Sequence, residues 1–301
     1  TAALGSVMVP EMKKRKYDAG FSAALVAAAG SIGLIIPPSI ALIVYGASAQ
    51  ASIGDLFMAG IIPGLLIAGG FMIYCYIVAR AKNLPREGNF SWGNVWKSFK
   101  SAFWALLMPI IIIVGIRGGF FTATEGGAVI SVYALFVGMF IYKEIKIKDF
   151  PKIFFQAAIS TAVITSIIAA TSLFGWLLTS EQVPQKFANA LLGVTDNPVL
   201  IVLILLVVGL FIDSSPAILL LTPILVPVAT SIGMDLVQFG IMMVISLTIG
   251  LLTPPVGTAL FVASNISKVP ILELSRKLIP FLIIMLTVTL LVAFFPILTN
   301  L

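Results

Sequence analysis

The chain has 301 residues, of which 60% are apolar and only 10% charged, and its mean hydropathy of +1.14 places it in a lipid bilayer rather than in water. It contains no His and a single Cys, Cys75, which excludes Cys–His metal sites, Ser-His-Asp triads and internal disulfides. The net charge of +6 comes from basic residues clustered between apolar runs, and membrane orientation explains that pattern better than nucleic-acid binding.

Seven apolar runs are long enough to cross a bilayer, which takes about 20 residues. They lie near residues 18–48, 55–80, 101–118, 121–142, 153–179, 235–264 and 278–299. The sequence therefore predicts an all-α polytopic membrane protein.

An amphipathic segment at 89–103 differs from these spans. Ser91 is a candidate helix cap, and apolar side chains follow it on one helical face, with the lysines off that face. The apolar residues are Trp92, Val95, Trp96, Phe99 and Phe103, and the lysines are Lys97 and Lys100. This pattern predicts a helix in the membrane interface that links two halves of the protein, although an ordinary amphipathic linker fits it equally well.

Segment 197–232 is almost wholly apolar, but Asp213-Ser-Ser-Pro-Ala divides it into halves of about 15 residues, too short to cross comfortably. We interpret it as a re-entrant hairpin whose tip is buried in protein or faces a watery cavity, because free backbone groups are not tolerated against lipid. A kinked pair of spans is the alternative.

Pro37-Pro38 ends the stretch Ser31-Ile-Gly-Leu-Ile-Ile, and Pro254-Pro255 ends the similar stretch Thr248-Ile-Gly-Leu-Leu-Thr. The offset, 254 − 37 = 217, superposes further pairs without a gap. These are Val9 and Val226, Pro10 and Pro227, Asp18 and Asp235, Gly33 and Gly250, Ile62 and Ile279, and Pro63 and Pro280. A repeat of membrane helices that are broken by Gly and Pro in mid-bilayer is typical of secondary transporters.

The distribution of basic residues predicts the orientation. Clusters at 13–16, 80–86, 143–152 and 268–277 all fall on the cytoplasmic side when the crossings are counted, and the turns near 48–54 and 228–234, without Lys or Arg, fall outside. Because 13–16 is equivalent to 230–233, equivalent corners face opposite sides, and the repeats are predicted to be inverted.

Broken helices free carbonyls at one stub and amides at the other. Carbonyls and hydroxyls suit Na⁺, whereas amide-rich helix N-termini suit a carboxylate. Candidate Na⁺ ligands are Gly33, Pro37, Pro38 and Ser39 at the first break, Asp213, Ser214 and Ser215 at the hairpin tip, and Gly250, Thr253, Pro254, Gly257 and Thr258 at the second break. Candidate substrate contacts are Ser39, Ser215, Pro216 and Thr258.

Two acidic residues need an interpretation. Asp213 is the only ionisable residue between Asp196 and Asp235, and a carboxylate buried in a membrane is functional by default. It either ligates Na⁺ or accepts hydrogen bonds that hold the tip together, and we favour the second role. Glu125 is best explained as an acid in the first turn of the following helix, where the helix dipole stabilises it.

Five segments resemble the large membrane subunit of tripartite ATP-independent periplasmic (TRAP) transporters. They are Met8-Val-Pro-Glu-Met12, Ile32-Gly-Leu-Ile-Ile-Pro-Pro-Ser-Ile40, Gly115-Ile-Arg-Gly-Gly-Phe-Phe-Thr-Ala-Thr-Glu125, Gly209-Leu-Phe-Ile-Asp-Ser-Ser-Pro-Ala217 and Gly250-Leu-Leu-Thr-Pro-Pro-Val-Gly257. The resemblance covers essentially the whole chain in the expected order.

The resemblance implies an elevator-type symporter of a bacterial inner membrane, driven by Na⁺ and without an organic cofactor. It also implies a small four-helix membrane subunit and a periplasmic binding protein that delivers an organic acid. Dicarboxylates, sialic acids and other sugar acids all remain open as the substrate.

The resemblance and the repeat together imply a division of the chain into transport and scaffold parts. The expected segments are 1–54, the end of a first hairpin and a broken helix (transport); 55–103, a scaffold span and an interfacial arm helix; 104–180, spans of the second repeat (scaffold and transport); 181–267, the second hairpin and broken helix (transport); and 268–301, a final scaffold span. The repeat would start the first hairpin at 197 − 217 = −20, so we expect the chain to begin inside that hairpin, with Ala2 to Met12 as its returning arm. The partner of span 101–118 would begin at 101 − 217 = −116, so we expect a further span outside the sequence.

Three other functions were weighed. A single-chain Na⁺/dicarboxylate symporter of the same superfamily is the nearest alternative, but Thr124-Glu125 and the Trp-rich helix favour the tripartite kind. An intramembrane enzyme needs a catalytic pair, and the chain has no His and only Asp213 as an acid deep in a span, so we predict that it is not an enzyme. A passive channel fits broken helices less well than alternating access does.

Overall fold

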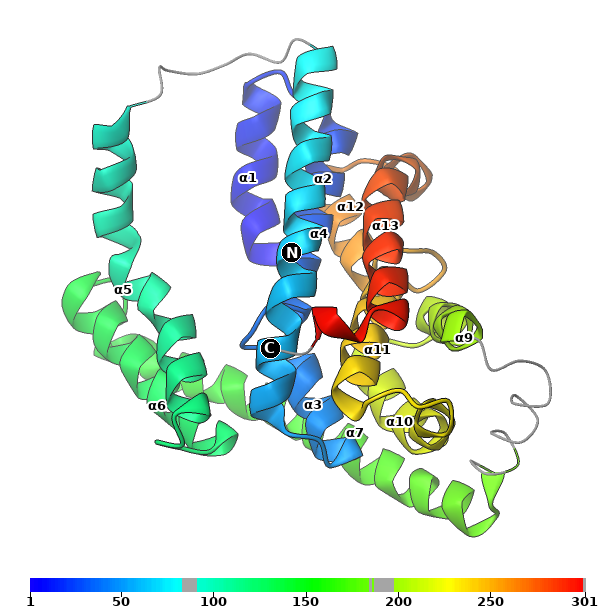
Figure 1. Cartoon of the computed structure of the whole chain (residues 1–301). Coiled ribbons are helices and arrows are strands. Elements are labelled where there is room, and N and C mark those ends of the chain that lie inside the picture. Colours follow the sequence, from blue (N-terminus) through cyan, green and yellow to red (C-terminus); the bar gives the residue numbers. More distant parts are fainter. Residues whose placement is uncertain (83–90, 184–185, 187–197, 300–301) are drawn as a thin grey trace. The chain divides into compact units, whose positions relative to one another are not determined.

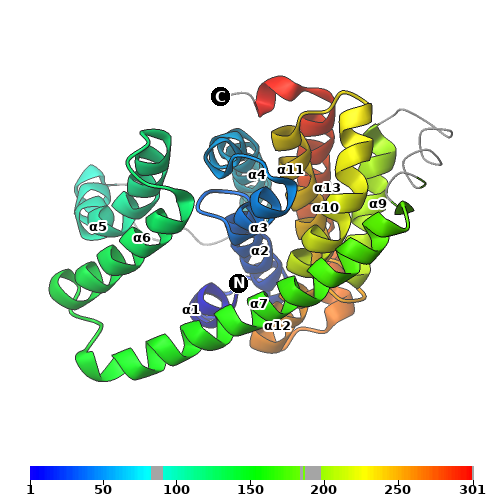
Figure 2. The same ribbon diagram turned by 90° about the horizontal axis from the view of Figure 1, so that it is seen from below.

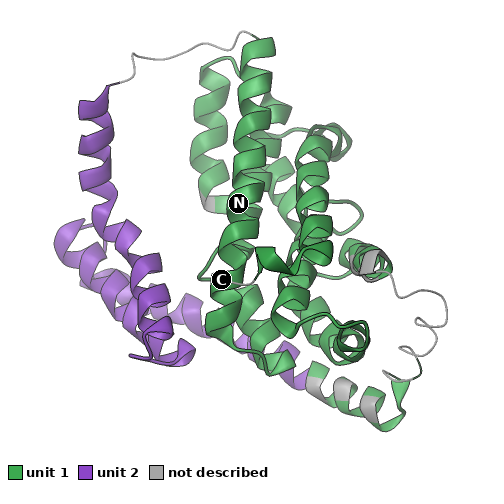
Figure 3. Cartoon of the chain, viewed as in Figure 1, with its two compact units in different colours: residues 1–85, 171–301 green, residues 86–170 purple. Residues whose placement is uncertain are grey.

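The computed structural model describes residues 1–82, 91–183, 186 and 198–299, and every regular element within them is helical. The chain divides into two units, one formed by residues 1–85 and 171–301 and the other by residues 86–170 (Figure 3). Among the described residues, six helices are long and apolar enough to cross a membrane. This arrangement confirms the prediction of an all-helical polytopic protein.

The first unit contains two sets of helices and the short connections between them (Figure 1). The earlier set is α1 (Ala2–Lys14), α2 (Ala19–Ser31), η1 (Ile32–Leu34), α3 (Ile40–Ala49) and α4 (Ile53–Ala81). The later set is α9 (Pro198–Phe211), α10 (Ser214–Ser231), α11 (Leu236–Leu251), α12 (Thr258–Ser267), α13 (Ile271–Phe294) and η4 (Pro296–Leu298). The runs predicted at 18–48 and 235–264 are therefore each divided into two shorter helices, as the Gly and Pro residues indicated.

The helix ends reproduce the repeat. α1 ends at Lys14 and α10 at Ser231, and α2 begins at Ala19 and α11 at Leu236, so both pairs differ by 217. After the breaks, α3 and α12 begin 218 residues apart, as do α4 and α13. Asp18 and Asp235 cap α2 and α11 in the same way, by accepting hydrogen bonds from backbone N–H groups of the first turn.

The packing of these helices follows the same exchange. α1 packs on α2 and α12, while α10 packs on the equivalent helices α11 and α3. Likewise, α13 packs on α2 and α4 packs on α11. Figure 2 shows α9, α10, α11 and α13 gathered beside α2, α3 and α4. Each of these four contacts thus has a counterpart with the two sets exchanged, as an approximate two-fold axis would produce.

Equivalent helices run in opposite directions. The Lys277 Nζ lies 3.4 Å from Asp18 Oδ1, so the starts of α2 and α13 are together. Gln238 Nε2 donates to the Val292 carbonyl at 2.8 Å, so α11 starts where α13 ends. Partial burial works against the charged form of Asp18, but the Phe21 N–H and the Lys277 ammonium outweigh it and lower the pKa of that carboxyl.

Basic residues collect at one end of this unit. Lys13 Nζ donates to the Ser267 carbonyl at 2.5 Å, which joins the ends of α1 and α12 beside the starts of α2 and α13. The opposite end, formed by 46–56, 228–238 and 289–299, carries Asp55 and Asp235 and no Lys or Arg. Clusters 13–16 and 268–277 therefore share one end of the unit, as the sequence predicted.

Cysteine labelling is expected to distinguish the two ends across a membrane. In a Cys75→Ser background, cysteines at Ser48 and Ser231 should react with an impermeant reagent from outside, and cysteines at Arg15 and Lys268 only from inside, because Lys and Arg are retained on the cytoplasmic side. Labelling of positions 15 and 231 from the same face would contradict the inverted repeat.

The second unit contains α5 (Trp92–Arg117), α6 (Ala123–Phe136) with a π-helical turn at Val137–Ile141, η3 (Ile147–Asp149) and the larger part of α7 (Phe150–Ser180). The sequence predicted an interfacial helix at 89–103 and a separate span at 101–118, but α5 is one continuous helix. No Gly or Pro stands between Gly93 and Pro109, so nothing in the sequence breaks it.

Glu125 lies in the first turn of α6, as predicted. Its Oε2 accepts a hydrogen bond from the Thr122 N–H at 2.7 Å, and Thr122 Oγ1 accepts from the Glu125 N–H at 3.3 Å. These reciprocal bonds form a capping box, which accounts for the acid without a role in transport.

The segment predicted as a re-entrant hairpin, 197–232, contains two helices of different length. α9 has 14 residues and α10 has 18, which places α10 among the six candidate spans. Only Ile212 and Asp213 separate them, because Ser214–Ala217 form the first turn of α10 rather than an open tip.

Candidate ion and solute site

The hairpin tip and the second helix break are in direct contact. The Val256 N–H donates to the Leu210 carbonyl at 3.2 Å. Thr258 Oγ1 donates to Asp213 Oδ2 at 3.3 Å, which joins positions 45 residues apart in the chain. The ends of α9 and α11 and the starts of α10 and α12 therefore meet at one place.

Two glycines allow this contact. A Cβ on Gly250 would lie 2.2 Å from the Gly209 carbonyl oxygen, so α9 and α11 cross with their backbones nearly touching. Gly250 was predicted from the sequence as a site residue, whereas Gly209 and Leu210 were not. The available signal was that Gly209 is the only glycine in the apolar run 198–212.

The N-termini of α10 and α12 have no side-chain caps. Their N-cap residues, Asp213 and Gly257, make no capping hydrogen bond, whereas Ser39 caps α3. The first N–H groups of a helix have no partner within it and carry a partial positive charge. Both ends are thus suited to an oxygen ligand, and Asp213 places a carboxylate between them.

The chain after α11 brings a hydroxyl, two prolines and a glycine to the second break. Thr253 Oγ1 donates to the Ile249 carbonyl at 2.7 Å. This bond uses the proton of the hydroxyl and leaves its lone pairs as acceptors. Pro254 and Pro255 have no N–H and cannot continue the helix. Gly257 has a positive φ of 30°, and a Cβ there would lie 2.9 Å from the Thr253 carbonyl oxygen. Only glycine fits that turn without strain.

The first break is built differently. Ser39 is buried, and its Oγ donates to the Leu34 carbonyl at 2.5 Å and accepts from the Leu42 N–H at 3.3 Å. The backbone of this break lies against α4, because a Cβ on Gly60 would be 2.7 Å from the Ile35 carbonyl oxygen. Both breaks contain a cis Pro-Pro bond, at Pro37-Pro38 and Pro254-Pro255.

The candidate residues fall into two groups. Asp213, Ser214, Ser215, Pro216, Gly250, Thr253, Pro254, Gly257 and Thr258 belong to the tip and the second break. Gly33, Pro37, Pro38 and Ser39 belong to the first break, and among the described residues no hydrogen bond joins this group to the other. Gly33 is exposed, with open space around the position of a Cβ.

The chemistry of the second group is that of hard oxygen donors. The described residues contain no cluster of three or more His, Cys, Asp or Glu side chains. The donors at the break are hydroxyl and carbonyl oxygens with the single carboxylate of Asp213, a set that suits Na⁺ at a broken helix. Which of these atoms binds an ion stays a prediction.

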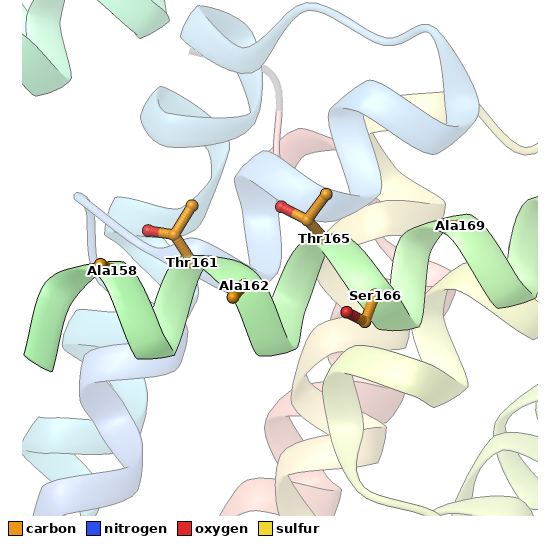
Figure 4. A pocket seen from close by; sticks show the side chains of 6 residues that line it. All are labelled: Ala158, Thr161, Ala162, Thr165, Ser166 and Ala169. Carbon is orange, nitrogen blue, oxygen red and sulfur yellow. The ribbon is translucent and has the colours of Figure 1, made fainter.

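A hollow of another kind runs along α7 (Figure 4). It is lined by small side chains at helical spacing, and Thr161 and Thr165 point to the same side of the helix. The lining residues are Ala158, Thr161, Ala162, Thr165, Ser166 and Ala169. Small residues in membrane helices typically mark close helix contacts, and no charged group lines the hollow, so we do not assign it to an anion or a cation.

Residues 1–298 match the family model of the tripartite ATP-independent periplasmic transporter, DctM component. The chain belongs to the DctM family. Members of the DctM family are permease components rather than enzymes, and with six candidate spans this chain is an integral protein of the inner membrane.

Several relatives in the DctM family are named for a substrate. The isethionate TRAP transporter permease DctMQ of Oleidesulfovibrio alaskensis is 42% identical over 98% of this chain and 47% of its own length. The sialic acid permease SiaM of Vibrio cholerae is 41% identical over 97% of this chain, and the C4-dicarboxylate permease DctM of Pseudomonas aeruginosa is 40% identical over 98%. The chain spans 70% of each of the latter two.

Proposed function

We propose that this chain is the large membrane subunit of a Na⁺-coupled TRAP transporter that imports an organic acid by an elevator mechanism. A small membrane subunit and a periplasmic binding protein complete the transporter. The relatives named for isethionate, sialic acid, C4-dicarboxylates and 2,3-diketo-L-gulonate support an organic anion as the substrate class.

The observation that carries the proposal is the meeting of the hairpin tip with the second break. The uncapped starts of α10 and α12 offer N–H groups to a carboxylate, and the Asp213 side chain and nearby carbonyls offer oxygens to Na⁺. Because Asp213 is itself negative, an anionic solute is repelled until a cation offsets that charge. This arrangement would couple solute binding to Na⁺.

The two units favour a revised division into moving and static parts. α4 and α13 were expected to be scaffold spans, but they pack on α2 and α11 in the same unit as both breaks. We therefore assign α1–α4 and α9–α13 to the moving body and residues 86–170 to the scaffold.

Reconstitution in proteoliposomes tests the function. Radiolabelled isethionate, sialic acid, succinate and diketogulonate should be screened with this chain, its small subunit and the binding protein, with and without an inward Na⁺ gradient. We expect uptake of at least one acid only when all three proteins and Na⁺ are present. Uptake of free substrate at full rate by this subunit alone would support a single-chain Na⁺/dicarboxylate symporter instead.

A further inference from the structure

Residues 92–100 of α5 extend beyond the helix that packs against it. α5 has 26 residues, which makes it about 39 Å long, longer than the hydrocarbon core of about 30 Å. Figure 1 shows that α5 changes direction part-way along, and Pro109 is the residue within it that cannot donate a helical hydrogen bond.

Contacts within the unit fix the level at which α5 leaves its neighbour. The Tyr142 hydroxyl donates to the Ser101 carbonyl at 2.8 Å, and the Tyr133 hydroxyl donates to the Trp104 carbonyl at 2.9 Å. Tyr142 ends the π-helical turn after α6, and Lys143 follows it. Lys143 belongs to the basic turn 143–152, so Ser101 lies level with the end of the apolar layer, and residues 92–100 continue for about 14 Å past it.

The chemistry of this extension matches the headgroup layer. Trp92, Trp96 and Phe99 are 77%, 61% and 44% exposed, and the rings of Trp96 and Phe99 stack at 5.7 Å. Lys100 Nζ lies 5.9 Å from the centre of the Trp96 ring. Trp at this level, with Lys beside it, is typical of the membrane interface.

The charge of the extension is uniformly positive. There is no Asp or Glu from residue 91 to residue 124, and the first turn of α5 has no acid to offset the positive end of its dipole. Lys97 and Lys100 add two full charges within the first three turns. Anionic phosphate groups at a membrane surface are the complementary partner.

We propose that Trp92–Lys100 is a membrane-interface anchor that binds anionic phospholipid headgroups. The extension is continuous with a spanning helix, so it lies at the membrane surface by connectivity. The headgroup layer on one side is about 5–8 Å deep, and Phe99 and Trp96 lie at most about 7.5 Å beyond Ser101 along the helix, within that layer. Lys97 and Lys100 lie at the same level, where their side chains extend toward the phosphates.

Fluorescence quenching tests the depth of the anchor. In the full chain in lipid nanodiscs, Trp92, Trp104 and Trp176 are replaced by Phe, so that Trp96 is the only tryptophan, and a matched variant keeps Trp104 alone. Bromine placed high on the acyl chains should quench Trp96 at least twofold more than bromine placed low, and the ratio should fall for Trp104, which is eight residues further along. A Trp96 that neither lipid quenches would be covered by protein or water and would overturn the proposal.

A second measurement tests the charge. Brominated phosphatidylglycerol and brominated phosphatidylcholine are compared as quenchers of Trp96, which gives their relative association at this site. We expect phosphatidylglycerol to be favoured over phosphatidylcholine by about fivefold per lysine. This ratio corresponds to about 1 kcal/mol for each basic residue near the surface. The preference should disappear in Lys97→Gln/Lys100→Gln and persist in the control Lys186→Gln. Equal quenching by both lipids with the lysines present would contradict the anionic partner.

Discussion

Replacing Gly250 by alanine should destabilise the first unit and abolish transport. The new Cβ would lie 2.2 Å from the Gly209 carbonyl oxygen and 2.4 Å from its carbonyl carbon, distances that no side-chain rotation relieves because both atoms are backbone. Overpacking of this kind typically costs about 1–3 kcal/mol or forces a backbone shift. Here the shift would separate the hairpin tip from the second break.

Two matched variants isolate the cause. Gly33, equivalent to Gly250 in the repeat, has nothing within 4 Å of a Cβ, so Gly33→Ala should leave the thermal stability in detergent almost unchanged. Gly209→Ala places its Cβ no closer than 3.4 Å to α11, an ordinary contact, and should also be tolerated. If Gly250→Ala has the same melting temperature and uptake rate as Gly33→Ala, then α9 and α11 do not cross this closely.

The pair Gly33 and Gly250 also shows which features the sequence predicted and which it did not. The breaks, the repeat and the shared caps at Asp18 and Asp235 follow from local signals, because Gly and Pro interrupt a helix wherever they occur. The different surroundings of the two glycines follow from tertiary packing, which one sequence does not reveal. For the same reason the contact between Leu210 and Val256 was missed.

The predictions for α5 and α10 erred in a related way. The polar stretch 213–216 was taken as an open tip, yet Ser214 and Ser215 begin a helix, and the change from amphipathic to apolar sequence near 101–103 was taken as a boundary, yet α5 continues through it. Ser and Asp favour the first turn of a helix as much as a loop, and lysine is a good helix former. The composition therefore indicated where the surface lies, but not where the helices end.

Asp213→Asn is expected to lower the apparent affinity for Na⁺ in uptake by about ten- to a hundredfold. Asn keeps the volume and can still accept the hydrogen bond from Thr258 Oγ1, so the variant removes charge with little change in shape. Losing a charge-assisted interaction costs about 1.5–3 kcal/mol, and each 1.4 kcal/mol is about tenfold in affinity. Folding should survive, because the carboxylate is the group that is costly to place in a membrane.

Thr258→Val distinguishes the two roles of Asp213. It removes the hydrogen bond between the two side chains but keeps the carboxylate. If Asp213 only holds the tip together, both Thr258→Val and Asp213→Asn should lower the thermal stability, and their effects should be non-additive in the double variant. If the carboxylate also ligates Na⁺, Asp213→Asn raises the Na⁺ concentration for half-maximal uptake far more than Thr258→Val does.

Thr230→Val is the matched control for both variants, because the Thr230 hydroxyl bonds only to carbonyls of its own helix. It should leave the Na⁺ dependence unchanged. The measurement is uptake against Na⁺ concentration beside thermal unfolding in detergent. A wild-type Na⁺ affinity in Asp213→Asn would show that this carboxylate neither binds the ion nor orders its site, and the coupling would then have to reside in hydroxyls and carbonyls alone.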